Sequence, residues 1–294
     1  FMPKRLIELV KQERATVLVG IPSMFNAIAS LKSGTPEHFA SLRLVVSGSE
    51  ALPDAVQQKF LERYAKPITE GYGMTEMSPG THCAVPGRSK PHSVGQPMPG
   101  VVQRIVDPAT GLDRPPGVPG EIRLDGPNRM SGYLHLPEKT AEAFDEQGYY
   151  RTGDLGRIDE EGYLYITGRI KEMMIIGGEN VFPREVEEVL DRHPIIHASG
   201  VIGQHDPTRG ETPVAFVELE EGVDPALFDE RELIAFCREH LAGYKAPKRV
   251  IRVDALPRNP TGKILRRDLK QSLGAAEQSG AERRSAGGCG GERA

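Results

Sequence analysis

The sequence predicts an α/β fold in which a large part with mixed sheets and helices is followed by a smaller α+β domain. Three observations support this prediction. Apolar segments with strand and helix periodicity alternate over the first part of the chain. From about Gly95 the pattern changes to short strands separated by Gly and Pro, which predicts a small β-barrel-like part. A new strand and helix pattern begins near Arg169.

The elements of the alternating part follow from local signals. The opening residues FMPKRLIELV mix apolar and charged side chains as an amphipathic helix does. The β-branched run TVLVGIP predicts a strand, and a helix follows with Ser23 as its N-cap. A second β run, LRLVVSG, ends at Gly48, and Asp54 then begins a helix. The apolar face of this helix is predicted to carry Val56, Phe60, Leu61 and Tyr64.

The later elements are shorter. The segments VVQRIVD, GEIRLDG and YLYITG predict strands. In the smaller domain Pro183 lies in the first turn of a helix, PVAFVEL is a strand, and a helix capped by Asp229 ends at Gly243. Residues 273–294 are almost free of apolar side chains, so we expect a disordered tail there.

Composition excludes several classes of protein. The 294 residues are 38% hydrophobic and 27% charged, which is globular composition. The net charge of −4 provides no basic field for nucleic acid. No apolar run approaches the roughly 18 residues of a membrane span, so we expect no transmembrane segment; peripheral membrane association and the oligomeric state stay open. Three scattered cysteines, Cys83, Cys237 and Cys289, argue against a disulfide framework or a zinc site and favour a cytoplasmic setting.

One Gly-flanked loop, EGYGMTEMSP, combines three kinds of ligand group. Gly71 and Gly73 bracket Tyr72, and Thr75 and Glu76 follow. An aromatic face, a hydroxyl and a carboxylate suit a purine, a phosphate oxygen and Mg²⁺ respectively. The alternative is an ordinary loop with a packed tyrosine and a solvated glutamate.

Three further loops carry charged side chains beside glycines. In YYRTGDLG, Asp154 stands in a tight Thr-Gly-Asp turn, where its carboxylate could accept two hydrogen bonds from a ribose diol. Arg169 could reach the same nucleotide, and Lys263 resembles a mobile cation at a loop tip. Each of these residues taken alone fits a surface turn or a solvated side chain equally well.

Together, in order along the chain, these motifs resemble those of the adenylate-forming superfamily, which includes acyl-CoA synthetases, nonribosomal-peptide adenylation domains and luciferases. The resemblance extends over nearly the whole chain, to about Leu269. The matching segments are GIPSMF, SGSEAL, GYGMTE, GEIRLDGPNRMSGYL, YYRTGDLG, GRIKEMMIIGGENVFPREVE and NPTGKILRRDL.

The resemblance implies roles for individual residues. In such enzymes adenine lies between the motif tyrosine, here Tyr72, and a Gly-containing turn. The motif threonine contacts the α-phosphate, the motif glutamate binds Mg²⁺, and an aspartate and an arginine hold the ribose. A mobile lysine bridges the carboxylate, the α-phosphate and the ribose. The implied residues besides Tyr72 are Gly48, Ser49 and Glu50 in the turn, Gly71 and Gly73, Thr75, Glu76, Asp154, Arg169 and Lys263.

A second set of roles concerns transfer to a thiol. The family rotates its small domain about a hinge, here Lys171, where many relatives carry Asp. The rotation brings the GGEN loop, with Gly177 and Gly178, to the tunnel for the phosphopantetheine arm. Met24, Phe25 and Met77 would border the acyl site and favour an apolar acid, while His82 and Cys83 would be wall or core residues there.

The family's Ser/Thr/Gly-rich phosphate loop is absent from the sequence. We therefore expect the C-terminal half of a synthetase: part of the large domain over 1–168, a hinge at 169–171 and the small domain over 172–272. The expected activity is ATP-dependent activation of a fatty acid or other apolar carboxylic acid, followed by thioester formation with CoA. The alternatives are an acyl-[acyl carrier protein] ligase and a non-catalytic nucleotide-binding module.

Overall fold

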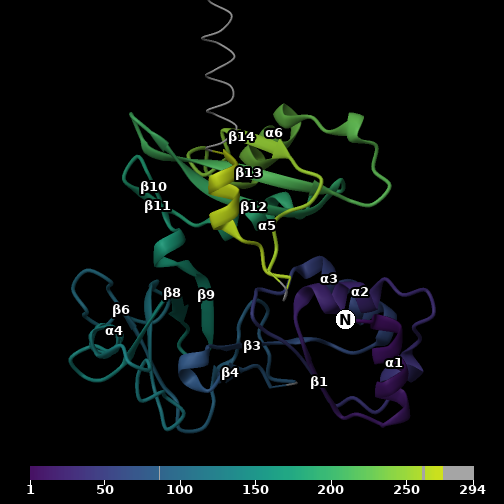
Figure 1. Cartoon of the computed structure of the whole chain (residues 1–294), viewed down its shortest axis with the longest axis horizontal. Coiled ribbons are helices and arrows are strands. Elements are labelled where there is room, and N and C mark those ends of the chain that lie inside the picture. Colours follow the sequence, from purple (N-terminus) through teal and green to yellow (C-terminus); the bar gives the residue numbers. More distant parts are fainter. Residues whose placement is uncertain (86, 260–261, 274–294) are drawn as a thin grey trace, which may run out of the picture. The chain divides into compact units, whose positions relative to one another are not determined.

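The structure is a computed structural model that describes residues 1–85, 87–259 and 262–273. The chain divides into two compact units, the first spanning Phe1–Lys171 and the second beginning at Glu172 (Figure 1). The expected disordered tail lies outside the described residues, apart from Leu273. That residue is buried in the core of the second unit, so the tail does not begin at 273.

The first unit opens with a mixed five-stranded sheet in the order β1-β2-β3-β4-β5. The first three strands are parallel and the last two pair antiparallel, as expected where helices connect only the first three. The strands are β1 (Val17–Gly20), β2 (Leu44–Ser47), β3 (Thr69–Gly73), β4 (Gly80–Cys83) and β5 (Gln96–Pro97), and the helices are α1 (Pro3–Gln12), α2 (Pro22–Ala29) and α3 (Asp54–Tyr64).

An aromatic core joins these helices to the sheet. Phe25, Phe39, Phe60 and Tyr64 are all buried and pack ring against ring, and the Tyr64 hydroxyl donates to the Ile28 carbonyl at 2.7 Å. Phe60 and Tyr64 of the predicted face of α3 are therefore confirmed as core residues and Val56 packs against them, but Leu61 is 40% exposed, so its place on that face is wrong.

One predicted helix start is wrong. Pro22 occupies the first turn of α2 and Ile21 is the N-cap, so Ser23 caps nothing. Pro is favoured at this position because its fixed φ suits a helix and its missing N–H is not needed there.

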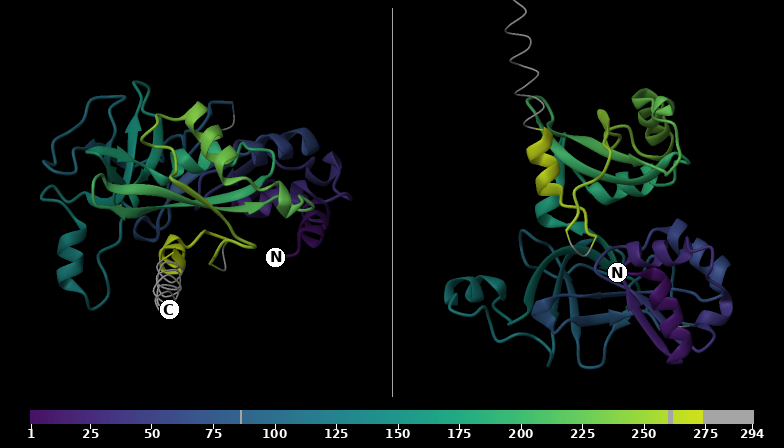
Figure 2. Two further views of the ribbon diagram at one scale, coloured as in Figure 1. Left: turned by 90° about the horizontal axis from the view of Figure 1, so that it is seen from above. Right: turned by 45° about the vertical axis from the view of Figure 1, so that its right-hand side comes forward.

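The second sheet of this unit is antiparallel and runs in sequence order β6-β7-β8-β9. It is the structure of the predicted β-barrel-like part. Its strands are β6 (Val102–Val106), β7 (Gly120–Asp125), β8 (Tyr150–Ile158) and β9 (Leu164–Arg169). Helix α4 (Pro137–Ala143) buries none of its residues and projects from the sheets (Figure 2).

The second unit is built on a sheet in the order β11-β10-β13-β12, with β14 parallel to β13. Residues 266–273 are also helical. The strands are β10 (Met174–Ile176), β11 (Glu179–Val181), β12 (Ile196–Asp206), β13 (Gly210–Leu219) and β14 (Arg249–Arg252), the helices are α5 (Pro183–Leu190) and α6 (Glu230–His240), and short 3-10 turns are η1 (Pro36–Phe39), η2 (Thr75–Met77), η3 (Ile170–Glu172) and η4 (Pro225–Leu227).

Both faces of this sheet are covered. Val217 packs into the core formed with α5 and α6, whereas Phe216 packs with Leu269 and Leu273 on the other side. Because neighbouring strand residues point to opposite faces, a doubly covered strand must be apolar at consecutive positions, which explains the run PVAFVEL.

The helix signals of this unit are mostly correct. Pro183 lies in the first turn of α5, and the Asp229 carboxylate caps α6 by accepting from two backbone N–H groups. The predicted stop at Gly243 is wrong, since α6 ends at His240 and Leu241 is already extended. The fold class, an α/β large part followed by a small α+β domain, is confirmed.

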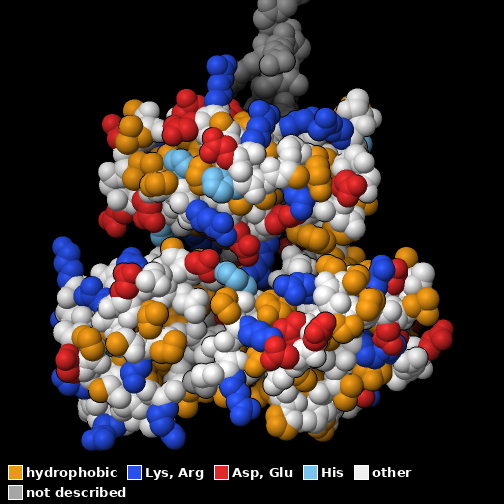
Figure 3. Space-filling model, turned by 180° about the vertical axis from the view of Figure 1, so that it is seen from behind, with side chains coloured by type: hydrophobic (Ala, Val, Ile, Leu, Met, Phe, Trp, Pro, Cys, Tyr) orange, Lys and Arg blue, Asp and Glu red, His pale blue; other side chains and the backbone are white. Residues whose placement is uncertain are grey.

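The surface shows no dominant sign of charge. On the face drawn in Figure 3, Lys and Arg side chains are interspersed with Asp and Glu on each unit. Among the described residues no helix is both long enough and apolar enough to cross a membrane.

Candidate functional site

Two predicted segments meet at the carboxyl edge of the parallel strands. The turn Gly48–Glu50 follows β2 directly, and a Cβ added to Gly48 would lie only 3.6 Å from the Gly71 carbonyl oxygen in β3. Ser49 in this turn has a left-handed backbone with φ +71°, which a residue with a side chain adopts only where the surroundings impose it. This edge is where open α/β sheets bind ligands.

The segment around Tyr72 is a strand rather than the predicted loop. Tyr72 pairs with His82 of β4 in the sheet register. A Cβ on Gly73 would lie 2.0 Å from the Pro79 carbonyl oxygen, so no larger residue fits. Gly73 therefore lets two backbone segments pack closely. The sequence analysis instead expected the missing side chain to make room for a ligand.

A buried carboxylate gathers three of the predicted residues. The Tyr72 hydroxyl donates to Asp154 Oδ2 at 2.6 Å, and Arg169 Nε lies 2.8 Å from Asp154 Oδ1. Burial, together with the charge and the hydrogen bond of Asp154, raises the pKa of Tyr72 well above its ordinary value, so the phenol stays protonated as the donor. The sequence prediction that Tyr72, Asp154 and Arg169 act together is thus compatible with their geometry.

This carboxylate retains capacity for a ligand. An ionised carboxylate has about four lone-pair positions. Asp154 makes two side-chain contacts, with Tyr72 and Arg169, and the Arg169 side chain is 54% exposed. The cluster can therefore offer acceptors to a diol and a cation to an anionic group.

Asp154 sits in a bulge of β8, not in a tight turn as predicted. Glu121 of β7 pairs with Leu155 and Arg123 pairs with Arg151, so three residues of β8 face the single residue Ile122. Gly153 in the middle has φ +69°, a conformation that glycine adopts without strain.

Glu76 lies in η2 and has a partner that the sequence did not indicate. The Tyr133 hydroxyl donates to Glu76 Oε1 at 2.9 Å and lies 3.4 Å from the Tyr150 hydroxyl. Thr75, one residue earlier, is exposed. No local pattern links Tyr133 to Glu76, because the contact is between residues 57 positions apart.

The donor set at Glu76 suits Mg²⁺ held together with a nucleotide. Within the described residues no group of three or more His, Cys, Asp or Glu side chains is placed to hold a metal ion. Mg²⁺ is commonly bound by one or two carboxylates plus substrate phosphates. Glu76 fits that arrangement, in which the phosphates supply most of the ligands.

Of the neighbouring residues on β4, His82 is buried and Cys83 is half-buried. Burial lowers the pKa of His82 to about 4, and its ring contacts Thr81 Oγ1 at 3.0 Å and Gln103 Oε1 at 2.9 Å. Burial raises the pKa of the Cys83 thiol. A neutral histidine and a protonated thiol form no activated nucleophile, as expected from the sequence.

Two of the three predicted acyl-site residues are core residues. Phe25 is 1% exposed inside the aromatic core, and Met77 is fully buried in the core of the second sheet. Phe25 and Met77 are each enclosed by core packing, whereas Met24, on the same helix as Phe25, is half-buried. That these three residues border an acyl site stays a prediction.

The remaining predicted residues belong to the end of the first unit and to the second unit. Lys171 is the last residue of the first unit and is exposed. Gly177 (φ +62°) and Gly178 (φ +90°) form the two-residue turn of the β10–β11 hairpin, and a Cβ on either would meet nothing within 4 Å. Lys263 closes a small loop in which its N–H donates to Asn259 Oδ1 and its carbonyl accepts from the Asn259 N–H, each at 2.9 Å.

An ion-pair network supports that loop. Arg266, three residues after Lys263, donates to Glu187 Oε2 at 2.7 Å and to Glu172 Oε2 at 2.8 Å. Glu187 Oε1 also accepts the backbone N–H of Val201 at 2.7 Å. The segment that follows Lys263 is therefore fixed to the body of the second unit.

The comparisons with known families identify the class of this chain as AMP-binding enzymes. Residues 1–134 match the family model of the AMP-binding enzyme, and residues 185–263 match that of the AMP-binding enzyme C-terminal domain. The chain belongs to this adenylate-forming superfamily.

Two relatives and one solved structure show the similarity. The chain is 41% identical to a long-chain-fatty-acid–CoA ligase of Bacillus subtilis, over 92% of the chain and 48% of the relative. It is 36% identical to the fatty acid–[acyl-carrier-protein] ligase ScoC of Streptomyces coeruleorubidus, over 92% and 52%. The crystal structure of ATP-bound MatB from Rhodopseudomonas palustris superposes with a TM-score of 0.86 at 38% identity, over 92% and 53%. The chain spans about half the length of the curated relatives it matches.

Proposed function

We propose that the chain takes part in activating a carboxylic acid with ATP, through an acyl-adenylate, and in passing the acyl group to the thiol of CoA. The observation that supports this most is the cluster in which Asp154 is held by Tyr72 and Arg169, beside the turn that follows β2. Such a cluster suits the ribose and the base of a nucleotide.

The chemistry has two steps. A carboxylate oxygen of the acid attacks the α-phosphorus of ATP, and the bond to pyrophosphate breaks. The thiol sulfur then attacks the acyl carbon, AMP leaves with the bonding electrons, and the thiol proton passes to solvent. The first step converts a poor leaving group, oxide, into a good one.

The chain's own residues have proposed roles in the first step. Tyr72 and the Gly48–Glu50 turn hold the adenine, Asp154 and Arg169 hold the ribose, and Thr75 contacts the α-phosphate. Lys263 offsets negative charge that develops on the phosphate. Glu76 would hold Mg²⁺, which when bound supplies further charge stabilisation.

The second step assigns roles to the hinge and the hairpin. We propose Lys171 as the hinge between the two units, and Gly177 and Gly178 as the part that meets the phosphopantetheine arm. The support is that Lys171 is exposed at the end of the first unit and that the glycine turn has open space around it.

The acid is proposed to be a fatty acid or another apolar carboxylic acid. This proposal rests on the similarity to the Bacillus subtilis ligase rather than on an acyl site in the described residues. Similarity to ScoC favours a second candidate acceptor, an acyl carrier protein, whose phosphopantetheine arm presents the same thiol chemistry as CoA.

The test is a thioester assay with two acceptors. The chain is incubated with ATP, Mg²⁺ and palmitate, and with either CoA or holo acyl carrier protein, and the acyl thioester is measured. We expect palmitoyl-CoA; thioester only on the carrier protein would favour the second candidate.

A separate assay addresses the non-catalytic alternative. Palmitate-dependent exchange of pyrophosphate into ATP that the Lys263→Ala variant lacks would support catalysis. AMP binding with no exchange and no thioester would instead indicate a nucleotide-binding module.

A further inference from the structure

The bulge that carries Asp154 is held from within its own sheet. The Thr152 hydroxyl donates to the Ile122 carbonyl at 2.7 Å and accepts the Asp154 N–H at 3.0 Å. One side chain therefore anchors the bulge to β7 and sets the backbone of Asp154 directly.

A second clamp acts on the middle of the bulge. Glu121 Oε1 accepts the N–H of Gly153 at 3.3 Å, while Glu121 Oε2 accepts from Arg123 Nε at 3.0 Å and Nη2 at 2.8 Å. Glu121 is 5% exposed and Arg123 is 3% exposed, so this ion pair, in which two guanidinium N–H groups share one carboxylate oxygen, is almost shielded from water.

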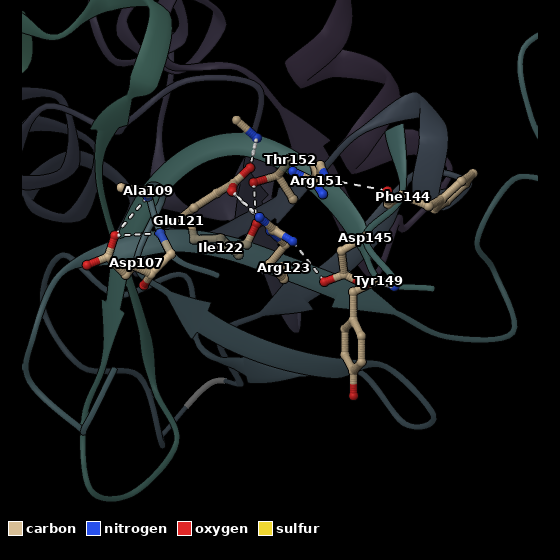
Figure 4. A network of polar contacts seen from close by, with 12 residues as sticks. Asp107, Ala109, Glu121, Ile122, Arg123, Phe144, Asp145, Tyr149, Arg151 and Thr152 are labelled. Atoms are coloured by element: carbon tan, nitrogen blue, oxygen red, sulfur yellow. Dashed lines mark hydrogen bonds and ion pairs between the residues drawn. The ribbon is translucent and has the colours of Figure 1, made fainter. Parts of the chain in front are cut away.

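The network ends on Asp145. Arg123 Nη1 donates to Asp145 Oδ2 at 2.8 Å, and Asp145 Oδ1 accepts the N–H groups of Gln147 and Tyr149. Figure 4 shows Arg123 between the carboxylates of Glu121 and Asp145, with Thr152 close to Glu121.

Such a network is costly if its only task is stability. Burying charges requires desolvation that hydrophobic residues of similar volume avoid, so a buried ion pair is weak evidence for stabilisation. Here the network contacts the backbone of the bulge at Gly153 rather than a regular strand pairing. The residue after Gly153 is Asp154, whose carboxylate is buried. Fixing a three-residue bulge in one conformation is a task that apolar packing performs poorly.

We infer that Thr152 and the Glu121–Arg123–Asp145 network are positioning residues that set the Asp154 carboxylate for the two ribose hydroxyls of the nucleotide. The inference rests on the proposed role of Asp154 in ribose binding. They act through Asp154, so their loss lowers selectivity for the ribose diol more than it lowers binding of the base and phosphate.

The test compares two nucleotides on matched variants. Binding of AMP and of 2′,3′-dideoxy-AMP is measured by calorimetry for the wild type, Thr152→Val and Thr152→Ser. The control is Thr167→Val on the neighbouring strand β9, because among the described residues the Thr167 hydroxyl is buried without a hydrogen-bond partner.

We expect the wild type to prefer AMP over the dideoxy nucleotide, and Thr152→Val to reduce that preference about tenfold with similar binding of the dideoxy nucleotide. Thr152→Ser, which keeps the hydroxyl, and Thr167→Val should retain the preference. Glu121→Gln keeps the shape of the side chain but weakens its hold on Gly153. This variant should therefore lose part of the preference for AMP.

Two outcomes separate the failures. If the wild type itself does not prefer AMP, the ribose role within the proposed function is wrong. If the wild type prefers AMP and the Thr152→Val variant keeps the full preference, the positioning inference is overturned while the proposed function stands. If Thr152→Val does not fold, loss of preference in Glu121→Gln supports the inference and full preference in it overturns it.

Discussion

At the scale of single residues, the site depends on tyrosine hydroxyls that hold carboxylates. Tyr72 donates to Asp154, and Tyr133 donates to Glu76. A hydrogen bond to a charged group restricts a carboxylate to one orientation and is stronger than one between neutral groups. The carboxylates proposed to bind the ribose and Mg²⁺ are thus each held in one orientation by a tyrosine hydroxyl.

The Tyr133→Phe variant tests this at Glu76. Without the hydroxyl, the Glu76 carboxylate loses its preset orientation, and we expect the Mg²⁺ concentration for half-maximal pyrophosphate exchange to rise about threefold to tenfold, on the scale of a ~1 kcal/mol hydrogen bond. Tyr165→Phe is the matched control, because the Tyr165 hydroxyl donates to Asp159 at 3.3 Å instead. An unchanged Mg²⁺ requirement in Tyr133→Phe would refute the assignment.

At the scale of elements, local signals predicted two helix starts correctly, missed the cap of α2 by placing it at Ser23, and failed where backbones meet. Asp54 and Pro183 were identified as helix starts because the preference for an acidic residue or a proline in the first turn is local. The bulge at Gly153 was predicted as a turn, because the sequence Thr-Gly-Asp is compatible with a turn and with a bulge. Only the pairing of β8 with β7 distinguishes the two. Gly73 was predicted to leave room for a ligand beside the backbone. The Pro79 carbonyl, which excludes a side chain at Gly73, comes close only in the folded sheet, so the sequence could not show it.

The Gly73→Ala variant tests this account of β3. A Cβ 2.0 Å from the Pro79 oxygen forces the strand apart, and we expect a loss of about 1–3 kcal/mol in the free energy of unfolding, as for other overpacked sites. Gly48→Ala is the control, because its Cβ would make an ordinary contact at 3.6 Å. Urea unfolding measures both, and equal stability of the two variants would contradict the close approach.

At the scale of the whole molecule, the two units carry buried groups with opposite pKa shifts. In the first unit burial lowers the pKa of His82 from 6.5 to about 4. In the second unit burial raises the pKa of Asp191 from 3.8 to about 7, although Ser199 Oγ donates to Asp191 Oδ1 at 2.7 Å. Both groups are more easily neutral in the folded state than in the unfolded state.

These shifts predict opposite pH trends of stability. Between pH 6.5 and 4 the unfolded chain protonates His82 first, so the first unit loses stability as the pH falls. Between pH 4 and 7 the unfolded chain deprotonates Asp191 first, so the second unit loses stability as the pH rises.

Thermal unfolding from pH 4 to 8 checks these trends. We expect Asp191→Asn to remove the decline of the second unit with rising pH and His82→Gln to remove the decline of the first unit on acidification. Parallel pH profiles of the two units, unaffected by either variant, would contradict the assignment.

The proposed function depends most on the buried carboxylate of Asp154, between Tyr72 and Arg169, binding a nucleotide. Calorimetric titration with AMP of the wild type, Asp154→Ala and the surface control Asp113→Ala, whose side chain is 64% exposed, tests it most directly. Loss of hydrogen bonds to a charged acceptor, worth about 1.5–3 kcal/mol, predicts AMP binding weakened roughly 10-fold to 100-fold in Asp154→Ala and unchanged in Asp113→Ala. Equal AMP affinity of the wild type and Asp154→Ala, with both variants folded, would contradict it.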